Sequence, residues 1–316
     1  MTAAIETRAL ARRFGDTRAV DGVDLEVAQG EIFGFLGPNG AGKSTMVRML
    51  TTLLAPTGGT ARVAGFDVAD DAEKVRLHIG VALQDAALDP KQTGRELLDL
   101  QGRLYGLGAT ERHRRVDELL QLVDIGEAID RRIGTYSGGM KRRLDLAAAL
   151  VHQPQVLFLD EPTTGLDPTS RAAVWAEVRY LNEQLGMTIF LTTQYLEEAD
   201  ALAHRVGIIA RGKLVADGTP TELKRSIGSD VIIAKVAHGK GSAVVEAVSS
   251  IALVERTEVN GDEVVLSVAD GPSAISPVAV ALAHAGITVV GLTLRTPTLD
   301  DVFLRITGGR MQEDAA

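Results

Sequence analysis

Cysteine is absent from the 316 residues, which excludes disulfide bonds, thiolate metal sites and cysteine nucleophiles and suits a reducing compartment. Long hydrophobic runs are absent as well. The nearest candidate, Val278 to Leu292, is broken by His284 and Gly286, and we interpret it as a helix followed by a strand. The first ten residues lack the basic start and apolar stretch of a secretory signal. We therefore expect a chain that does not cross a membrane by itself.

Positive charge is scarce. The formal net charge is -9 at pH 7, whereas nucleic-acid-binding proteins usually carry a basic footprint. The short basic run Lys141-Arg142-Arg143 is too small to reverse this balance, and we interpret it as a solvated helix face. The composition therefore argues against nucleic acid as a partner.

What is present is the pattern of an α/β protein. Hydrophobic residues make up 45% of the chain and charged residues 24%, as in packed proteins, and the length allows two domains. Apolar runs typical of buried strands alternate with helical spacing, and a wholly helical insert falls at about 86–150. The pattern predicts a mostly parallel core sheet with an antiparallel β part. The expected strands are two within 5–27, then 31–36, 60–63, 79–83, 156–159, 188–192 and 205–210, and the expected helices are 43–54, 96–107, 111–123 and 137–150.

A second domain is expected after a composition shift that follows Lys224. We place the boundary between a domain at 1–227 and a domain at 228–316. The second domain reads in the order βαββαβ, with Asn260-Gly261 as a hairpin signal, which predicts a small ferredoxin-like α+β fold. A last helix is expected at 299–306. Asp300 and Asp301 at its start are interpreted as partners of the helix dipole rather than metal ligands.

The strongest motif is Gly37-Pro38-Asn39-Gly40-Ala41-Gly42-Lys43-Ser44, between a predicted strand and a predicted helix. The glycines let backbone N–H groups turn toward phosphate oxygens, and the helix start directs its positive dipole end at the same anion. Lys43 is expected to reach the β and γ phosphates, and Ser44 to ligate Mg²⁺. A chance Gly-rich turn is the alternative. The loop predicts Mg-ATP binding by Gly37, Pro38, Asn39, Gly40, Ala41, Gly42, Lys43, Ser44 and Thr45.

An acidic pair, Asp160 and Glu161, ends the predicted buried strand at 156–159. Alone, such a pair is more often a helix start or a solvated loop. Together with a phosphate loop in one sheet, it suits metal-assisted hydrolysis. Asp160 is expected to hold the metal through its hydration shell, and Glu161 to orient and deprotonate the attacking water.

Further motifs resemble those of the ABC ATPases, over about residues 1–225. Tyr136-Ser137-Gly138-Gly139-Met140 is similar to the family's signature sequence, and Pro162-Thr163-Thr164-Gly165-Leu166-Asp167 resembles its D-loop. The resemblance implies that Gln84 is the Q-loop glutamine, which contacts Mg²⁺, that Phe14 stacks on adenine, and that Asp167 belongs to the nucleotide site. On residues alone, Gln84 could be a surface glutamine and Phe14 a core aromatic.

The signature is also a second anion site, since Ser137, Gly138 and Gly139 open a helix. It lies too far along the helical insert to share the first loop's phosphate in one chain. A second copy packed head-to-tail could bring it onto the γ-phosphate, as the resemblance implies for this family. Ser137 could equally be a plain N-cap, or serve as both.

One position departs from the family. Gln194 stands after a strand where the resemblance implies a switch histidine. Glutamine can donate a hydrogen bond to a phosphate but does not titrate near neutrality. We expect hydrolysis to persist, with Lys43, Glu161 and Gln194 as the catalytic set, and without a pH transition near the histidine value.

Residues 137–146, 192–200 and 298–304 resemble the daunorubicin-resistance (DrrA-type) ATP-binding proteins. This resemblance implies ATP hydrolysis coupled to efflux of a hydrophobic drug, antibiotic or lipid, at the cytoplasmic face of the cell membrane, through a separate integral membrane permease. The alternatives are an importer ATPase with a C-terminal sensing domain and a soluble, non-transport ABC ATPase. The second domain is interpreted as a dimerisation or regulatory unit, so deleting 228–316 is expected to weaken assembly or coupling and to leave ATP binding intact.

Overall fold

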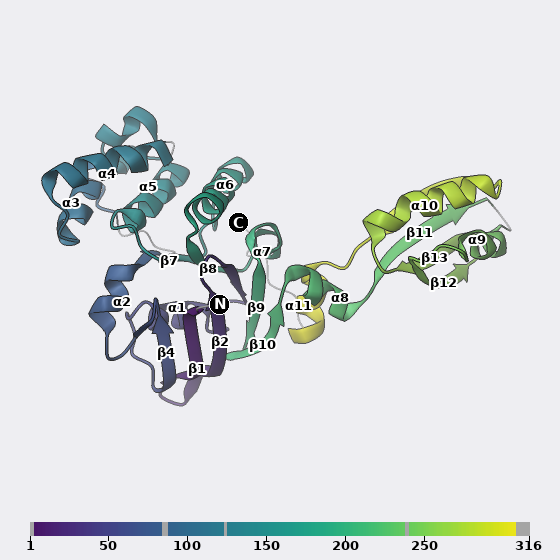
Figure 1. Cartoon of the computed structure of the whole chain (residues 1–316), viewed down its shortest axis with the longest axis horizontal. Helices are drawn as coiled ribbons and strands as arrows, with labels where there is room; N and C mark the ends of the chain where they lie inside the picture. Colours follow the sequence, from purple (N-terminus) through teal and green to yellow (C-terminus); the bar gives the residue numbers. More distant parts are fainter. Residues whose placement is uncertain (1–2, 84–87, 123–124, 238–239, 308–316) are drawn as a thin grey trace. The chain divides into compact units, whose positions relative to one another are not determined.

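The chain forms two compact units, one reaching to Pro220 and one beginning at Thr221. The computed structural model describes residues 3–83, 88–122, 125–237 and 240–307, and Figure 1 shows their helices and strands. The division falls at the start of helix α8 (Pro220–Ile227), while the boundary expected from sequence falls at its end. Each unit is therefore described by itself.

A six-stranded sheet, in the order β10-β9-β3-β8-β7-β6, forms the centre of the first unit. Its strands from β9 to β6 are parallel, and β10 pairs antiparallel with β9. Every residue of β3, β7 and β8 is buried, as their uninterrupted apolar runs predict for strands covered on both faces. The predicted parallel core is confirmed. The strands are β3 (Ile32–Leu36), β6 (Ile79–Ala82), β7 (Val156–Asp160), β8 (Thr188–Thr193), β9 (Arg205–Ala210) and β10 (Lys213–Gly218).

An antiparallel sheet in the order β2-β1-β4-β5 belongs to the same unit. Buried aromatic rings connect it to the parallel sheet, since Phe33, Phe158 and Phe190 share one hydrophobic core with residues of β1, β2 and β4. Helix α1 (Lys43–Leu50) contributes Met46 and Leu50 to this core and ends four residues before the predicted position. The strands are β1 (Ala3–Phe14), β2 (Thr17–Ala28), β4 (Gly58–Val63) and β5 (Phe66–Asp67).

The helical insert contains α3 (Gly94–Leu104), α4 (Ala109–Leu122) and α5 (Gly138–Leu150), at the upper left of Figure 1. Two short 3₁₀ helices, Gly126–Asp130 and Ile133–Thr135, precede α5. Thr93 and Glu96 form a reciprocal capping box at the start of α3, which satisfies two otherwise unpaired backbone donors. The three predicted helices are confirmed, with ends shifted by a few residues.

Three helices of the first unit were not predicted individually: α2 (Ala72–His78), α6 (Pro168–Leu185) and α7 (Leu196–Leu202). The boundary signals of α6 are present in the sequence. Asp167 caps its start, Pro168 occupies its first turn, and Gly186 ends it with a φ of 64°. Among the described residues, no helix combines the length and apolar character needed to cross a membrane.

The second unit confirms the ferredoxin-like prediction. Its elements follow the order βαββαβ, and its antiparallel sheet has the strand order β12-β13-β11-β14. The hairpin differs from the prediction by one residue, because Asn260 pairs with Glu263 and the loop is Gly261-Asp262. The elements are β11 (Asp230–Val236), α9 (Gly241–Val248), β12 (Val254–Asn260), β13 (Glu263–Val268), α10 (Gly271–His284), β14 (Val289–Arg295) and α11 (Leu299–Thr307).

The acidic start of α11 is a capping arrangement, as expected. The Asp301 carboxylate accepts hydrogen bonds from the backbone N–H and the hydroxyl of Thr298, which hold the pKa of Asp301 below its usual range. The Thr298 hydroxyl in turn accepts from the Asp301 N–H. No group of three or more His, Cys, Asp or Glu side chains able to hold a metal occurs among the described residues.

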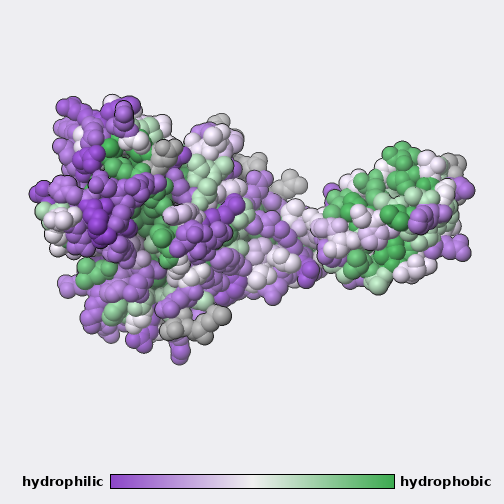
Figure 2. Space-filling model, turned by 45° about the horizontal axis from the view of Figure 1, so that its top comes forward, coloured by the Kyte–Doolittle hydropathy of each residue, from purple (hydrophilic) through white to green (hydrophobic). Residues whose placement is uncertain are grey.

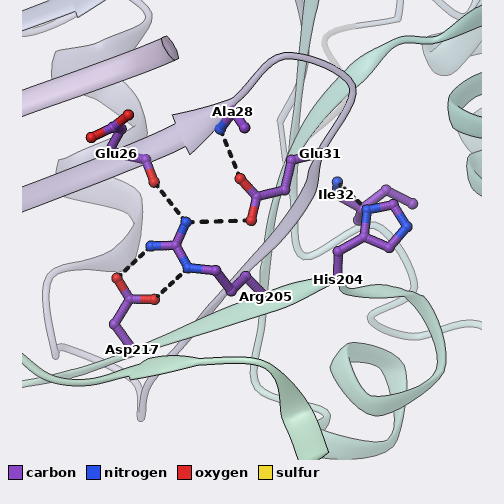
Figure 3. Close-up of polar contacts among 7 residues, drawn as sticks. All are labelled: Glu26, Ala28, Glu31, Ile32, His204, Arg205 and Asp217. Carbon is purple, nitrogen blue, oxygen red and sulfur yellow. Dashed lines mark hydrogen bonds and ion pairs between the residues drawn. The ribbon is translucent and has the colours of Figure 1, made fainter. Parts of the chain in front are cut away.

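A cluster of polar groups lies at the amino ends of the parallel strands β3 and β9 (Figure 3). Arg205, at the start of β9, donates two hydrogen bonds to the carboxylate of Asp217 on β10, at 2.9 and 2.6 Å. Its remaining nitrogen donates to the Glu26 carbonyl at 3.1 Å and to Glu31 at 3.4 Å. Glu31 also accepts from the N–H of Ala28 at 2.7 Å. This Arg205 cluster (Glu26, Ala28, Glu31, Arg205 and Asp217) ties β2 and β3 to β9 and β10.

Candidate nucleotide site

The predicted phosphate loop joins the end of β3 to the start of α1. A cavity of about 410 Å³ lies against it. Besides the loop, Glu161, Thr164 and Gln194 contribute to its wall, so the structure brings together residues from distant parts of the sequence. The loop residues that line the cavity are Pro38, Asn39, Gly40, Gly42, Lys43, Ser44 and Thr45, while Gly37 and Ala41 belong to the loop without lining it.

Glycine is required at two loop positions because the backbone passes close to other backbone atoms. A Cβ at Gly42 would lie 2.4 Å from the carbonyl oxygen of Ala19, and the φ of Gly42 is 116°. A Cβ at Gly37 would lie 2.5 Å from the carbonyl oxygen of Ile209. No L side chain fits these approaches without moving the backbone. The loop backbone therefore keeps a compact path that passes close to Ala19 and Ile209.

Lys43 and Glu161 face each other across the base of the cavity. The Lys43 ammonium lies 3.3 Å from a Glu161 carboxylate oxygen and donates a hydrogen bond to the Gly37 carbonyl at 2.7 Å. The two side chains are only 4% and 7% exposed. A buried, opposite-charge pair is held in place strongly, since either charge alone would carry a large desolvation cost. The Lys43 ammonium and the Glu161 carboxylate therefore both border the cavity beside the phosphate loop.

The acidic pair is fixed by the neighbouring strand β8. The Thr192 hydroxyl donates a short hydrogen bond to the Asp160 carboxylate, and the N–H of Glu161 donates to the Thr192 carbonyl at 3.0 Å. Glu161 adopts a φ of 48°, a left-handed conformation that is unfavourable for a non-glycine residue. Such strain is concentrated at functional sites, where the surrounding structure enforces it. Thr192 was not predicted as a site residue, although its place at the end of a parallel strand beside the acidic strand was the available signal.

The oxygen donors near the cavity suit Mg²⁺ better than a metal that needs a full protein cage. Ser44 lines the cavity, and Asp160 ends β7 directly before Glu161, which also lines it, so one hydroxyl and one carboxylate are available nearby. Mg²⁺ usually keeps several waters and is bound through one or two protein ligands plus substrate phosphates. The donor set therefore fits Mg²⁺ brought in with a nucleotide.

Gln194 lines the same cavity, one residue after the end of β8. Helix α7 follows it, and the buried Glu198 of this helix accepts hydrogen bonds from Thr163 at 2.8 Å and from the Trp175 indole at 2.9 Å. Burial raises the pKa of Glu198. Sequence reasoning missed this residue, which connects the segment after Gln194 with the loop after the acidic pair.

The signature sequence opens α5, as expected. The Ser137 hydroxyl accepts a hydrogen bond from the N–H of Met140 at 3.2 Å, so Ser137 is the N-cap. Ser137 and Gly138 are exposed, and no signature residue lines the cavity described above. The predicted contact between the signature and a phosphate is therefore not formed at the cavity of its own chain.

The D-loop lies beside the signature. A Cβ placed on Gly139 would lie 3.2 Å from the Ser170 hydroxyl, in the first turn of α6. Asp167 caps this helix by accepting from the N–H of Ser170 at 3.0 Å and from its hydroxyl at 2.6 Å. These hydrogen bonds hold the pKa of Asp167 below its usual range. Gly139 of the signature therefore lies next to the turn that Asp167 caps.

Phe14 ends β1, and its side chain is 46% exposed, which contradicts the alternative of a core aromatic. The Arg12 guanidinium lies 4.7 Å from its ring centroid. Phe14 does not line the phosphate-loop cavity, so its role toward adenine stays a prediction. Gln84, the predicted Q-loop glutamine, lies outside the described residues.

The interpretation of Lys141-Arg142-Arg143 as a solvated face is wrong for its two arginines. Arg142 is largely buried and donates to the carbonyl oxygens of Leu83 at 2.7 Å and Asp160 at 3.4 Å. Arg143 forms an ion pair with Glu177 of α6. Arg142 stands one helical turn before the buried Leu146, so it shares the face that packs inward. The number of charges in the run does not reveal that Arg142 is buried, because burial depends on helical periodicity.

Comparison with known proteins extends over both units. The family model "ABC transporter" matches residues 20–164, and the model "ATP-binding protein DrrA1-3-like, C-terminal domain" matches residues 218–307. The chain is 48% identical to the daunorubicin resistance ATP-binding protein DrrA2 of Streptomyces coeruleorubidus, over 99% of this chain and 98% of the relative. It is 46% identical to the daunorubicin/doxorubicin resistance ATP-binding protein DrrA of Streptomyces peucetius, over 100% and 97%.

Among solved structures, a dimeric ATP-binding cassette in a post-hydrolysis state, bound to ADP and Pi, is similar with a TM-score of 0.62. It is 25% identical and is matched over 68% of this chain and 98% of that chain. A structure titled as the ATP-binding subunit of an ABC transporter is similar with a TM-score of 0.64 and 28% identity, over 71% of this chain and 93% of that chain. The solved structures thus match 68% and 71% of the chain, and the two sequence relatives match 99% and 100% of it.

Proposed function

We propose, because this chain belongs to the DrrA family of ABC transporter ATP-binding proteins, that it drives efflux of a hydrophobic drug, antibiotic or lipid through a separate membrane permease. It is an ABC transporter ATPase, a subunit that binds ATP and couples its hydrolysis to transport. The similarity to resistance proteins over both units carries the proposal of efflux. The family model for the second unit adds independent support.

The residues of the cavity account for hydrolysis as follows. The loop N–H groups and Lys43 would hold the β and γ phosphates, and Ser44 and Asp160 would hold Mg²⁺, which neutralises charge on the transferred phosphoryl group. Glu161 would orient the attacking water and accept its proton. Gln194 would donate a hydrogen bond from its amide to the γ-phosphate.

Two copies of the chain would complete each site. The exposed N-cap Ser137 and the adjoining Asp167 surface lie outside their own chain's cavity and are available to a second copy. The dimeric cassette bound to ADP and Pi provides a precedent in a related fold. We propose a head-to-tail dimer in which each copy supplies a phosphate loop to one ATP and a signature to the other.

The permease contact is assigned to a second cavity, of about 320 Å³, between the end of α1, β6, α3 and α5. Its wall includes Leu53, Leu83 and Tyr105, and Leu53 is 58% exposed. Val81 also belongs to the wall, so the apolar side chains gather in one place, and such a patch favours a protein partner over solvent. A cytoplasmic segment of the permease is the proposed occupant, which would hold the chain at the cytoplasmic face of the membrane.

Two experiments test the proposal. Replacing the proposed base by Glu161→Gln should lower ATP hydrolysis by at least about 100-fold, because proton transfer by a positioned side chain contributes that much. ATP binding should persist, and the variant should accumulate as an ATP-bound dimer. Glu183→Gln, an exposed glutamate of α6, is the matched control and should hydrolyse normally. Normal hydrolysis by the Glu161 variant would exclude Glu161 as the base.

Transport is tested by co-expressing the chain with candidate permeases and measuring accumulation of a fluorescent anthracycline in cells. Efflux predicts lower accumulation with the native chain than with Glu161→Gln. Accumulation that rises with the native chain would favour the importer alternative. ATP hydrolysis that never responds to the permease would favour a soluble ATPase.

A further inference from the structure

We infer that Arg142 is a positioning residue for hydrolysis. Its side chain connects α5, the helix that the signature opens, to the strand ends next to the acidic pair. The inference rests on the proposed function, since it assigns a role within the same site. It concerns a residue that contacts neither the phosphate loop nor the cavity beside it, and it follows from the contacts of one buried side chain.

The guanidinium of Arg142 lies where three elements meet. It donates to the carbonyl oxygen of Leu83, just after β6, at 2.7 Å, and to that of Asp160, the last residue of β7, at 3.4 Å. It also pairs with Asp145 of its own helix at 3.3 Å. β6 and β7 are neighbouring parallel strands, so one side chain holds both carboxyl ends. Leu83 directly precedes Gln84 in the sequence, and Asp160 precedes Glu161.

The pair of Arg142 and Asp145 is a poor source of stability. The two side chains are only 11% and 14% exposed. Burial lowers the pKa of Arg142 and raises that of Asp145 to about 6, which means that desolvation outweighs their mutual attraction for both partners. A buried ion pair of this kind is often no more stabilising than an apolar pair of the same volume. The role of the Arg142–Asp145 pair therefore follows from its position and not from a contribution to stability.

That geometry joins the signature to the hydrolytic residues inside one chain. Arg142 stands in the second turn of α5, and Ser137 caps the first turn. A helix is stiff over this length, so a displacement of Ser137 by a second copy's ATP would move Arg142 and the carbonyl groups it holds. Arginine suits this role because its planar fork carries several donors in fixed directions, which a lysine ammonium cannot reproduce.

Arg115, on α4, provides a matched control because it contacts the other end of α5. It donates to the carbonyl oxygens of Leu150 at 2.7 Å and Val151 at 3.2 Å, and it pairs with Glu118 at 3.0 Å. Its side chain is 15% exposed. The chemistry thus repeats that of Arg142, with two carbonyl groups and one carboxylate, but it lies at the end of α5 away from the signature.

The experiment compares Arg142→Lys with Arg115→Lys in the full chain, measuring kcat, the Kd for ATP and the thermal unfolding midpoint. Both changes should lower the unfolding midpoint to a similar degree. Arg142→Lys alone should lower kcat by about tenfold or more, with the Kd for ATP changed by less than about twofold, because it removes an arrangement needed for the reaction and not for binding. Equal kcat values in the two variants would overturn the inference. A native chain without ATPase activity would instead contradict the proposed function.

Asp145→Asn keeps the test decisive if Arg142→Lys fails to fold. It removes the carboxylate that orients Arg142 while keeping the volume, and at pH 7 it should leave the unfolding midpoint unchanged or raised. The inference predicts that kcat nevertheless falls by about threefold or more, with the Kd for ATP held constant. A stable Asp145→Asn variant with native kcat would overturn the role of the pair.

Discussion

The two ends of the parallel sheet differ in how their charges are arranged. At the amino ends, the Arg205 cluster forms bidentate hydrogen bonds between partly exposed groups, and Figure 3 shows the guanidinium surrounded by acceptors. At the carboxyl ends, Lys43, Glu161 and Arg142 are buried, and Glu161 adopts a left-handed backbone conformation. Glu31 is buried at the amino ends as well, but the Arg205 cluster does not line the nucleotide cavity, whereas Lys43 and Glu161 do. The difference indicates that the amino ends serve the fold, whereas the carboxyl ends place buried charge at the cavity.

The largest effect that would test this contrast is a loss of ATP affinity, measured by replacing one glycine with alanine at each end of the sheet. Gly42→Ala places a Cβ 2.4 Å from the Ala19 carbonyl at a φ of 116°, so the phosphate loop must distort. ATP affinity should fall by at least about 100-fold, which corresponds to roughly 3 kcal/mol. At the amino ends, Gly30 also has a positive φ, of 73°, but a Cβ there would lie 3.7 Å from its nearest neighbour, the Gly186 carbonyl oxygen.

Gly30→Ala should therefore cost only about 1 kcal/mol of folding stability, from backbone strain, and leave ATP affinity unchanged. Isothermal titration with ATP and thermal unfolding measure the two quantities on both variants. If both glycine substitutions weakened ATP binding equally, the two ends of the sheet would not differ as described.

The residues at the carboxyl ends were predictable from the sequence to different degrees. Lys43, Asp160 and Glu161 could be assigned because each motif needs its residue types at fixed places after a buried strand. Arg142 could not, because its acceptors at Leu83 and Asp160 are 59 and 18 residues away in the sequence. A charged run on a helix is usually solvated, and only the packing of α5 on the sheet ends reveals the exception.

The fold shows the same division between local and long-range information. The ferredoxin-like order of the second unit followed from alternation and from one turn signal, and it is confirmed. Helix α6 was missed although its cap, proline and terminal glycine are local signals. The one-residue shift of the hairpin at Gly261 arises because the strand pairing, set by packing on one face, decides the register.

The next largest effect is a pH dependence of stability at the carboxyl ends. The pKa of Asp145 rises from 3.8 to about 6 on folding, because burial disfavours its charge. The folded state therefore binds the proton more tightly than the unfolded chain between these values. The free energy of unfolding should fall as pH rises through this window, by no more than about 3 kcal/mol from this group, and the slope should end at about pH 7, where the folded carboxyl has lost its proton.

Asp145→Asn isolates this contribution, because the difference in unfolding free energy between variant and native chain should grow from about pH 4 to about pH 7 and then stay constant. Urea unfolding at each pH measures it. Asp217→Asn at the amino end serves as the comparison. A difference for Asp145→Asn that stays constant across the window would show that this carboxyl group does not carry the raised pKa.

A smaller effect is expected from the Arg205 cluster. Arg205→Gln removes two charge-assisted hydrogen bonds to Asp217 and leaves its carboxylate partly exposed, so folding should lose about 2 kcal/mol. The ATPase rate per folded molecule at 25 °C should change by less than about twofold, because no contact of the cluster reaches the nucleotide cavity. Thermal unfolding and steady-state kinetics measure the two effects. A tenfold loss of kcat with full stability would assign the amino ends a role in the reaction.

The smallest effect concerns Gln194 at the carboxyl ends, where the sequence departs from the histidine of its family. The amide of Gln194 does not titrate, so the Kd for ATP should lack a transition between pH 6 and 7.5 that depends on this side chain. Gln194→His should introduce one, at or above a pKa of about 6.5, because a neighbouring phosphate favours the charged imidazole. Below this pKa the charged donor forms a stronger hydrogen bond, so ATP should bind a few-fold more tightly at pH 6 than at pH 7.5. Both chains are measured in the Asp145→Asn background, in which the carboxyl group with a pKa of about 6 is absent and cannot titrate. The same Kd for ATP at pH 6 and pH 7.5 in the Gln194→His chain would remove position 194 from the phosphate contact.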